Sequence, residues 1–383
     1  MNARNPNVQH LSDQMPRTAL AFRGYNVTNL GRSGELLAHP AYGFTVERYL
    51  QRASAAAADT LKRPVDLVAL VRGGKETTLE TYGDAVALIL AMESAQLDLL
   101  RTHFGVDYTL AQFSLGYSLG EIAALVAGGV IGLEAALKIP LSLCDECVAL
   151  THDVTLGILF TRASELPLDD IRRICLAINS EGRGVIGISA HLSPNSVLLM
   201  GQQDTLDRFK TQAGEALPVK VQLRKNSDQW PPLHTPIVWE RQIPNRAAYL
   251  LHTLPMNMVE PKPPVLSLVT GRLSYTDSSA RSMLHQWVDH PQRLWEAMYE
   301  VLSQGIKTVL HVGPLPNLIP ATFKRLSDNV HSQTDRSLAM RTLSAAVRRP
   351  WLQAVLPQRA ALLRAPYVEH VILEDWLLAN APA

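Results

Sequence analysis

The chain has 383 residues, of which 47% are hydrophobic and 19% are charged, and its formal net charge is +1. This composition is typical of a well-packed globular protein and excludes a disordered one. The balance of 36 basic and 35 acidic residues argues against a nucleic-acid-binding protein, which normally shows a basic excess or stripe. No uncharged apolar run approaches the ~18–20 residues that span a membrane, and no apolar signal region stands at the N-terminus. We therefore expect a cytoplasmic protein that binds neither nucleic acid nor membrane.

The cysteine content points to a reducing compartment. The chain has three cysteines, Cys144, Cys147 and Cys175, too few for a disulfide framework. Cys144 and Cys147 form a C-x-x-C motif, but no second pair supplies the remaining ligands of a closed zinc site. We expect no metal site.

The first 150 residues alternate between strand and helix signals. Residues 1–16 are polar, and we expect them to be frayed. The hydrophobic patterns that follow predict strands at 18–22 and 108–115 and helices at 77–102 and 119–129. Ser118 falls in the turn between the second strand and the helix behind it.

A module with a different order of elements follows. Strand signals at 155–161, 184–192, 195–201 and 217–223 alternate with helix signals at 168–178 and 204–214. The order β-α-β-β-α-β is that of a ferredoxin-like fold. Further strands at 265–271 and 307–314 and a helix at 291–305 then resume the earlier pattern. The module is therefore predicted to be an insertion in a larger domain.

These signals together predict an α/β fold. A large α/β-hydrolase-like domain with a parallel sheet is expected from residues 1–150 and 224–330, and the ferredoxin-like subdomain from residues 151–223. Residues 331–383 are predicted to be a helical extension. Within it, helices are expected at 348–363 and 371–381, with a role in partner docking left open.

The stretch from Gly116 to Gly120 reads G-x-S-x-G, with Ser118 at its centre. Between a strand and a helix, such a turn exposes the serine oxygen, and its glycines tolerate strained and crowded backbone. The helix behind it directs amide N–H groups at the site, so that the N–H of Leu119 could stabilise an oxyanion. Ser118 is thus a candidate nucleophile, although a small residue at a tight turn is the alternative.

A serine nucleophile needs a base. Among 12 histidines, His234 is distinguished by the sequence "WPPLHTPIV", in which prolines on both sides restrict its backbone. Position alone makes it a weak candidate.

Four segments carry a family resemblance. "GYSLGEIAALVAGGVIGLEAALKI" (116–139) resembles the active-site region of the malonyl-CoA:acyl carrier protein transacylase family, which includes the acyltransferase domains of polyketide and fatty acid synthases. "LHTPIV" (233–238) resembles the histidine motif of that family. Residues 193–201 and 290–319 resemble a strand of its ferredoxin-like subdomain and its late V-G-P segment. The likeness is collinear over residues 18–326, so the chain is identified as a member of the family.

The resemblance implies a mechanism. Ser118 would be the acyl-accepting nucleophile, and His234 would be its general base, oriented by backbone carbonyls. The N–H groups of Leu119 and Tyr25 would form the oxyanion hole. An acyl-CoA would be the donor and the phosphopantetheine thiol of an acyl carrier protein the acceptor, in a ping-pong reaction without a bound cofactor. The expected partners are a carrier protein and a polyketide or fatty acid synthase.

The departures from the family pattern concern the substrate pocket. Leu143 stands 25 residues after the serine, where malonyl-specific members carry an arginine that binds the substrate carboxylate. Tyr25 replaces a glutamine in the loop "FRGYNVT" (22–28), and Tyr117 and Tyr82 replace a histidine and a second glutamine. Leu233 precedes the catalytic histidine, where the family has phenylalanine or serine. Because a buried, unpaired carboxylate is costly, the pocket is expected to prefer a neutral acyl group.

Four alternatives remain open. The chain could be a malonyl-CoA:acyl carrier protein transacylase in which another basic residue binds the carboxylate. It could be an acyl hydrolase that clears carrier proteins, or a non-catalytic subunit of a synthase. An unrelated α/β-hydrolase is the fourth alternative, but that fold places an acid and a histidine late in the chain.

Overall fold

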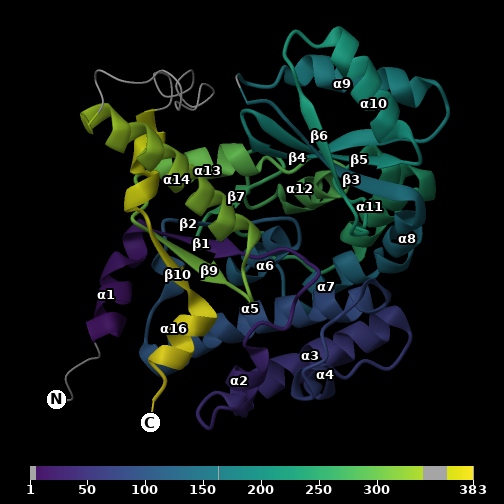
Figure 1. Ribbon diagram of the computed structural model, residues 1–383. Coiled ribbons are helices and arrows are strands. Elements are labelled where there is room, and N and C mark those ends of the chain that lie inside the picture. Colours follow the sequence, from purple (N-terminus) through teal and green to yellow (C-terminus); the bar gives the residue numbers. More distant parts are fainter. Residues whose placement is uncertain (1–5, 163, 340–359, 383) are drawn as a thin grey trace.

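The computed structural model describes residues 6–162, 164–339 and 360–382, and Figure 1 shows their arrangement. A six-stranded sheet lies at the centre of the larger part, in the order β10-β9-β1-β2-β7-β8. All neighbouring strands are parallel except the edge pair β7–β8, which is antiparallel. The strands are β1 (Thr18–Phe22), β2 (Phe113–Gly116), β7 (Val265–Ser267), β8 (Arg272–Leu273), β9 (Thr308–Val312) and β10 (Glu369–Ile372).

Helices cover both faces of this sheet because its central strands are apolar on both sides. All five residues of β1 are buried: Leu20 and Phe22 contribute to one hydrophobic cluster, and Ala19 and Ala21 to another. The first cluster is built with α3 (Gly43–Leu61), α5 (Tyr82–Phe104), α6 (Leu119–Ala127) and α7 (Leu133–Leu141). The second is built with α13 (Leu294–Ser303) and α14 (Leu318–Ala339). A continuous apolar strand of this kind is typical of a parallel sheet buried on both faces.

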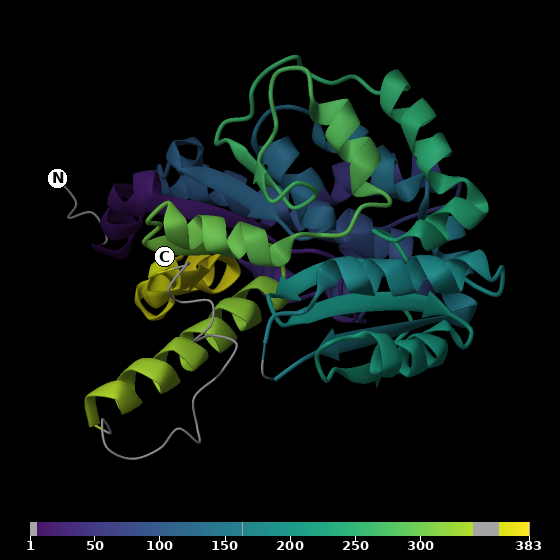
Figure 2. The same cartoon turned by 90° about the horizontal axis from the view of Figure 1, so that it is seen from above.

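The antiparallel sheet forms a smaller subdomain with its own hydrophobic cluster. Its strands are β3 (Val154–Phe160), β4 (Ile186–Ser193), β5 (Ser196–Gln202) and β6 (Gln222–Asn226), in the order β4-β5-β3-β6. Helices α9 (Leu168–Ser180) and α10 (Thr205–Ala216) pack on this sheet (Figure 2). This is the ferredoxin-like arrangement, so the predicted fold class is confirmed.

Seven further α-helices complete the described part of the chain. They are α1 (Pro6–Gln14), α2 (Ser33–Ala38), α4 (Leu67–Gly73), α8 (Cys144–Ala149), α11 (Ile243–Thr253), α12 (Ala280–Trp287) and α16 (Leu373–Ala379). In the part of the chain that the structure describes, no helix combines the length and apolarity needed to cross a membrane.

Several predicted boundaries are wrong. Residues 6–14 form a helix, which is anchored by buried Leu11. The strand expected at 108–115 begins only at Phe113, because the Asp107 side chain accepts a hydrogen bond from the N–H of Thr109 and closes a turn there. The strand expected at 217–223 is observed at 222–226, after Pro218, which cannot donate to a ladder.

The C-terminal prediction is also partly wrong. Residues 369–372 form β10, which pairs in parallel with β9, and the helix expected at 371–381 begins only at Leu373. A four-residue edge strand has too few positions to reveal its period, and it is defined by pairing with residues about sixty positions earlier. Of the helix expected at 348–363, residues 348–359 lie outside the described residues, and residues 360–363 begin a 3-10 helix.

Close packing of β1 against α6 requires a glycine. A Cβ atom on Gly120 would lie 2.4 Å from the carbonyl oxygen of Phe22, whereas one on Gly214, exposed in α10, would meet no atom within 4 Å. We therefore expect Gly120→Ala to lower the free energy of unfolding by about 1–3 kcal/mol through overpacking. Gly214→Ala is the matched control and should raise it by about 0.5–1 kcal/mol. Urea unfolding measures both, and equal effects of the two substitutions would contradict this account.

Candidate active site

Ser118 occupies a strained turn between β2 and α6. Its φ is +53°, which is unusual for a residue other than glycine and is the geometry expected of a nucleophile at a sharp strand-to-helix turn. Its backbone N–H and its carbonyl oxygen both form hydrogen bonds to buried side chains. The N–H of Ser118 donates to Oε1 of Gln292 at 3.0 Å, and the indole N–H of Trp287 donates to the Ser118 carbonyl at 2.9 Å. The serine hydroxyl is thus presented from a fixed backbone.

The structure brings His234 to this hydroxyl from 116 residues further along the chain. Nε2 of His234 lies 2.7 Å from Oγ of Ser118, and Nδ1 lies 2.6 Å from the carbonyl oxygen of Trp287. Because a carbonyl oxygen can only accept, the proton belongs on Nδ1, which leaves the Nε2 lone pair free to accept the serine proton. The backbone N–H of His234 also donates to the Val288 carbonyl at 2.8 Å. The imidazole is therefore fixed in position and in tautomer by backbone groups.

Burial keeps this imidazole neutral. His234 is 4% exposed, and its desolvation lowers the pKa to about 4, although the hydrogen bond to Trp287 opposes this shift. At neutral pH the base is consequently in the form that accepts a proton. When it does so, the Trp287 carbonyl stabilises the imidazolium.

Gln292 was not predicted from the sequence. Its side chain is fully buried, with Oε1 on the N–H of Ser118 and Nε2 lying 3.3 Å from Nδ1 of His234. Its backbone N–H donates to the Ser189 carbonyl, and its own carbonyl accepts from the N–H of His191, both at 2.8 Å. Gln292 thereby links the nucleophile to β4 of the small subdomain. It lies in the family-like segment 290–319, but nothing in the sequence singled it out, because its role depends on contacts with residues 58 to 174 positions away.

The predicted oxyanion donors lie on either side of the nucleophile turn. Leu119 is the first residue of α6, where N–H groups have no partner within the helix. A Cβ atom on Gly24 would lie 2.6 Å from the Tyr117 carbonyl oxygen, so the loop that carries Tyr25 lies against the residue before Ser118. Their role as oxyanion donors stays a prediction.

The guanidinium of Arg23 fixes the loop that carries Tyr25 through hydrogen bonds. Its guanidinium is 3% exposed and donates to the carbonyls of Gly24, Thr28 and Pro314 and to the side chain of Asn29. Burial lowers its pKa to about 10, against the opposing charge of Glu93, so the group is still cationic at neutral pH. A buried cation with four acceptors fixes the path of the loop.

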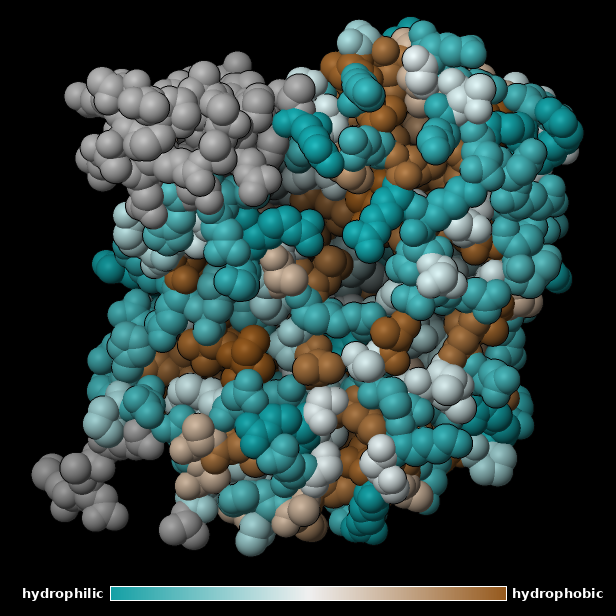
Figure 3. Space-filling model, in the orientation of Figure 1, coloured by the Kyte–Doolittle hydropathy of each residue, from teal (hydrophilic) through white to brown (hydrophobic). Residues whose placement is uncertain are grey.

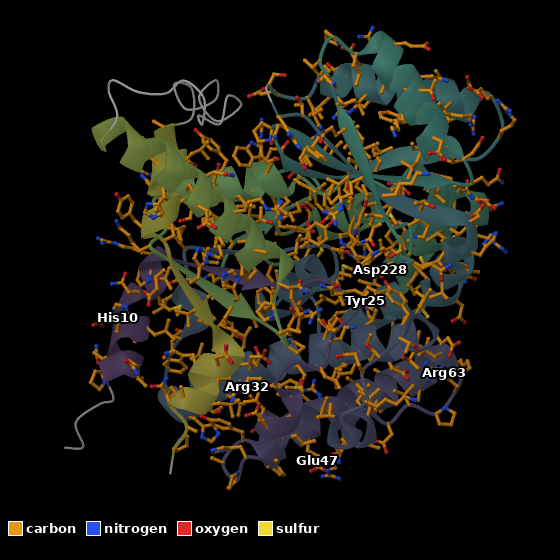
Figure 4. The ribbon with its side chains drawn as sticks, in the orientation of Figure 1. His10, Tyr25, Arg32, Glu47, Arg63 and Asp228 are labelled. Atoms are coloured by element: carbon orange, nitrogen blue, oxygen red, sulfur yellow. The ribbon has the colours of Figure 1, made fainter. Side chains whose placement is uncertain are left out.

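Three of the predicted pocket residues are buried in the same hydrophobic cluster. Tyr82, Leu143 and Leu233 are 6%, 2% and 7% exposed. The Tyr25 ring packs edge-on against Tyr82, with centroids 4.7 Å apart, and against Trp230 at 5.9 Å. Tyr25 lies at the junction of the two subdomains (Figure 4), where Figure 3 shows the surface hollowed and lined by hydrophobic side chains. The rings of Tyr25 and Tyr82, at the two positions that the sequence resemblance aligns with glutamines, thus pack together.

Leu143 and Tyr117 belong to two different hydrophobic clusters. Leu143 lines a cavity of about 390 Å³ whose other lining residues are Ser142 and four residues of α11: Asn245, Arg246, Tyr249 and Leu250. Arg246 is the only cation among these six, and it forms an ion pair with Glu146. Tyr117 packs on the hydrophobic cluster of the opposite sheet face. The roles of both residues in substrate binding stay predictions.

The buried carboxyl of Glu121 fixes α6 to the strands beside it. It accepts hydrogen bonds from the hydroxyls of Ser267 and Tyr275, at 2.5 and 2.8 Å, and from the N–H of Leu268 at 2.9 Å. Burial raises its pKa to about 7. The hydrogen bonds offset part of that desolvation and hold the first turn of the nucleophile helix in place.

No group of three or more potential metal ligands occurs among the residues that the structure describes. The three cysteines are free and buried, and burial raises the pKa of each thiol. They have no disulfide partner and are poorly suited to thiolate chemistry.

The overall architecture is shared with solved enzymes. The malonyl-CoA:acyl carrier protein transacylase of Xanthomonas oryzae pv. oryzae superposes with a TM-score of 0.64 and 22% identity, covering 80% of this chain and 90% of that one. A type II polyketide malonyl-transacylase in complex with its acyl-carrier protein gives a TM-score of 0.61 and 21% identity, covering 80% and 92%. The fold is that of the malonyl-CoA:acyl carrier protein transacylases. No family model matches this transacylase-fold chain.

Sequence comparison agrees with the predicted resemblance. Erythronolide synthase of Saccharopolyspora erythraea is 28% identical over 209 residues, which are 54% of this chain and 5% of that protein. A polyketide synthase of Streptomyces halstedii is 24% identical over 302 residues, 78% of this chain and 4% of that protein. The transacylase-fold chain therefore spans only a small part of the length of these synthases, and the predicted resemblance to the family is confirmed.

The buried imidazole predicts a pH dependence. Protonation of His234 removes the lone pair that accepts the serine proton, so acylation of Ser118 should stay constant down to about pH 5 and fall through about pH 4. Single-turnover acylation by an acyl-CoA, followed by intact-protein mass spectrometry between pH 3.5 and 8, measures this. Circular dichroism at each pH excludes unfolding as the cause. A midpoint near 6.5, the ordinary pKa of imidazole, would contradict the burial argument.

Loss of the Gln292 amide should release the backbone N–H of Ser118 and so misplace the nucleophile relative to His234. We expect Gln292→Leu to slow acylation of Ser118 by roughly 10- to 100-fold, since displacements of about 1 Å have effects of this size. Gln304→Leu, at an exposed glutamine after α13, is the control and should leave the rate unchanged. Wild-type acylation rates in a folded Gln292→Leu protein would show that the contact is dispensable.

Proposed function

We propose that this chain is an acyl-CoA:acyl carrier protein S-acyltransferase that works through an ester on Ser118. The observation that carries the proposal is the 2.7 Å contact between Oγ of Ser118 and Nε2 of a neutral, backbone-oriented His234. In the first half-reaction Oγ attacks the thioester carbonyl while Nε2 takes its proton. The N–H groups of Leu119 and Tyr25 stabilise the oxyanion. The C–S bond then breaks, and His234 returns the proton to the departing CoA thiolate.

The second half-reaction reverses the roles. The phosphopantetheine thiol of a carrier protein gives its proton to His234 and attacks the ester carbonyl, and the proton then returns to Oγ of Ser118. No bound cofactor takes part. The partners proposed here are a carrier protein and a polyketide or fatty acid synthase, in the cytoplasm. Similarity to polyketide synthases, and to a malonyl-transacylase solved with its acyl-carrier protein, supports this assignment.

The proposed acyl group is neutral. Leu143 is buried where the family carries its carboxylate-binding arginine, and Tyr25 and Tyr82 pack together in place of two glutamines. A leucine cannot replace the paired hydrogen bonds of a guanidinium, and an unpaired buried carboxylate is strongly disfavoured. The pocket composition therefore favours an acyl chain without a free acid.

Malonyl transfer is the second candidate, and one observation favours it. Arg246 lies beside Leu143 on the same cavity, so a guanidinium is available next to the position of the family arginine. It would have to leave Glu146, its present partner, to bind a substrate carboxylate. The malonyl specificity of the structural neighbours is consistent with this alternative.

A panel of acyl-CoAs decides between the candidates. Malonyl-, methylmalonyl-, acetyl- and longer neutral acyl-CoAs are incubated with the protein, and intact-protein mass spectrometry detects an adduct, with Ser118→Ala as the control. A neutral adduct that is absent from Ser118→Ala supports the proposal, and a malonyl adduct supports the second candidate. No adduct from any donor would favour a non-catalytic subunit. Release of the acyl group to water without an acceptor thiol would instead identify a hydrolase.

An arginine restored at position 143 should change the specificity. We expect Leu143→Arg to raise the ratio of malonyl to acetyl adduct at least about tenfold, the effect of roughly 1.4 kcal/mol of added carboxylate binding. Leu176→Arg, at a leucine that is 66% exposed on α9, is the control for added charge. Thermal unfolding shows whether each variant is folded. An unchanged ratio in folded Leu143→Arg would separate this position from the acyl pocket.

A further inference from the structure

We propose that the C-terminal segment, residues 368–379, is a working part of the active site, because its Glu374 positions the loop that carries the Tyr25 oxyanion donor. This inference rests on the proposed acyl-transfer function. It assigns a catalytic positioning role to a segment beyond residue 326, where the resemblance of the sequence motifs ends.

The segment is built into the large domain. β10 extends the central sheet beside β9, and α16 packs on α5 and α2 (Figure 1). Leu373 and Leu377 are fully buried in the main hydrophobic cluster. The Tyr42 hydroxyl donates to the Leu377 carbonyl at 2.9 Å, and the Trp376 ring packs on Phe104. These contacts dock the segment without any contribution from the Glu374 side chain.

The carboxylate of Glu374 joins two active-site loops. It is 2% exposed, with Oε1 accepting from the N–H of Leu315 at 2.7 Å and Oε2 accepting from the N–H of Arg32 at 2.9 Å. Leu315 follows β9, and Arg32 lies in the connection between β1 and α2. A Cβ atom on Gly31 would lie within 2.7 Å of both the Leu315 nitrogen and the Glu374 carboxylate. The two loops and the carboxylate are therefore packed in direct contact.

Arg23 links the same two loops at the end nearer β1. Its guanidinium extends from the loop after β1 and donates a hydrogen bond to the carbonyl of Pro314, the residue before Leu315. It also donates to the carbonyl of Gly24 at 2.8 Å, directly before Tyr25. The negative charge of Glu374 raises the pKa of Arg23 against the effect of its burial. Arg23 and Glu374 thus form a brace that fixes both ends of the segment 23–32, with Tyr25 inside it.

The brace has a consequence for catalysis. An oxyanion donor acts only when its N–H already points at the position of the developing charge. Hydrogen bonds to a charged acceptor are stronger than neutral ones, which suits a carboxylate for holding backbone N–H groups in a loop. Glu374→Gln keeps the volume of the side chain but turns an NH₂ group toward one of the two N–H donors, so one anchor is lost. The Tyr25 N–H should then be less well placed, while α16 stays docked.

The test compares neighbouring acids in the same helix. Glu374→Gln removes the brace contact, and Asp375→Asn makes the matched change at an exposed acid that pairs with Arg32 on the surface. We expect Glu374→Gln to lower kcat and kcat/KM of acyl transfer together by roughly 10- to 100-fold. The reason is that the hydrogen bond from the Tyr25 N–H to the oxyanion is made only in the transition state. The KM for acyl-CoA and the affinity for CoA should stay unchanged, whereas the unfolding midpoint should fall by no more than about a few degrees, because one buried N–H loses its acceptor. Asp375→Asn should behave like the wild type.

A transition-state mimic separates positioning from a merely structural role. A trifluoromethyl ketone analogue of acyl-pantetheine forms a tetrahedral oxyanion adduct on a reactive serine. Its affinity for Glu374→Gln should fall by the same factor as kcat/KM. Hydrogen exchange should also increase at residues 24–32 and not at α5.

The outcomes are distinguishable. Wild-type rates and wild-type exchange in Glu374→Gln would overturn the inference. A rate loss accompanied by an equal-fold loss of CoA affinity would show that Glu374 is only a structural residue and would overturn the inference as well. If the wild-type chain formed no adduct with any acyl-CoA, the proposed function would fail, and the catalytic part of this inference with it.

Discussion

The hydrogen bond between Nδ1 of His234 and the carbonyl oxygen of Trp287 determines what the site can do. It fixes the tautomer, so that Nε2 can accept a proton, and it turns the ring toward Ser118 at 2.7 Å. A backbone carbonyl is suited to this task because it needs no second titrating group. It also stabilises an imidazolium that burial alone would strongly disfavour.

That geometry depends on backbone segments from distant parts of the chain. The nucleophile turn packs against β1 through Gly120, and Gln292 joins Ser118 to β4 of the small subdomain. The junction of the two subdomains is thus bridged by hydrogen bonds to the reacting residues themselves. A change in the relative position of the two subdomains would consequently change the geometry of the serine–histidine pair.

The oxyanion side of the site is organised by charge. Arg23 and Glu374 are both nearly fully buried, and most of their hydrogen bonds run to backbone groups of the loops after β1 and β9. Buried charges of this kind are tolerated because each is satisfied by several hydrogen bonds. The aromatic and aliphatic residues Tyr25, Tyr82, Leu143 and Leu233 are held by apolar contacts instead. If they form the acyl pocket, as proposed, the two sides of Ser118 differ in chemistry.

By itself, the sequence determined the local elements and the reacting residues. The apolar run 18–22 became β1, the order of elements from 154 onward defined the ferredoxin-like subdomain, and G-x-S-x-G marked Ser118, since these signals depend on neighbouring residues only. The flanking prolines marked His234 only weakly, and the family motif was needed to assign it as the base. Gln292, the strand β10 and Glu374 could not be recognised at all, because their roles arise from hydrogen bonds to residues between 59 and 342 positions away. Tertiary structure decided those contacts: a side chain that holds the backbone of a distant loop leaves no periodic pattern in its own part of the sequence.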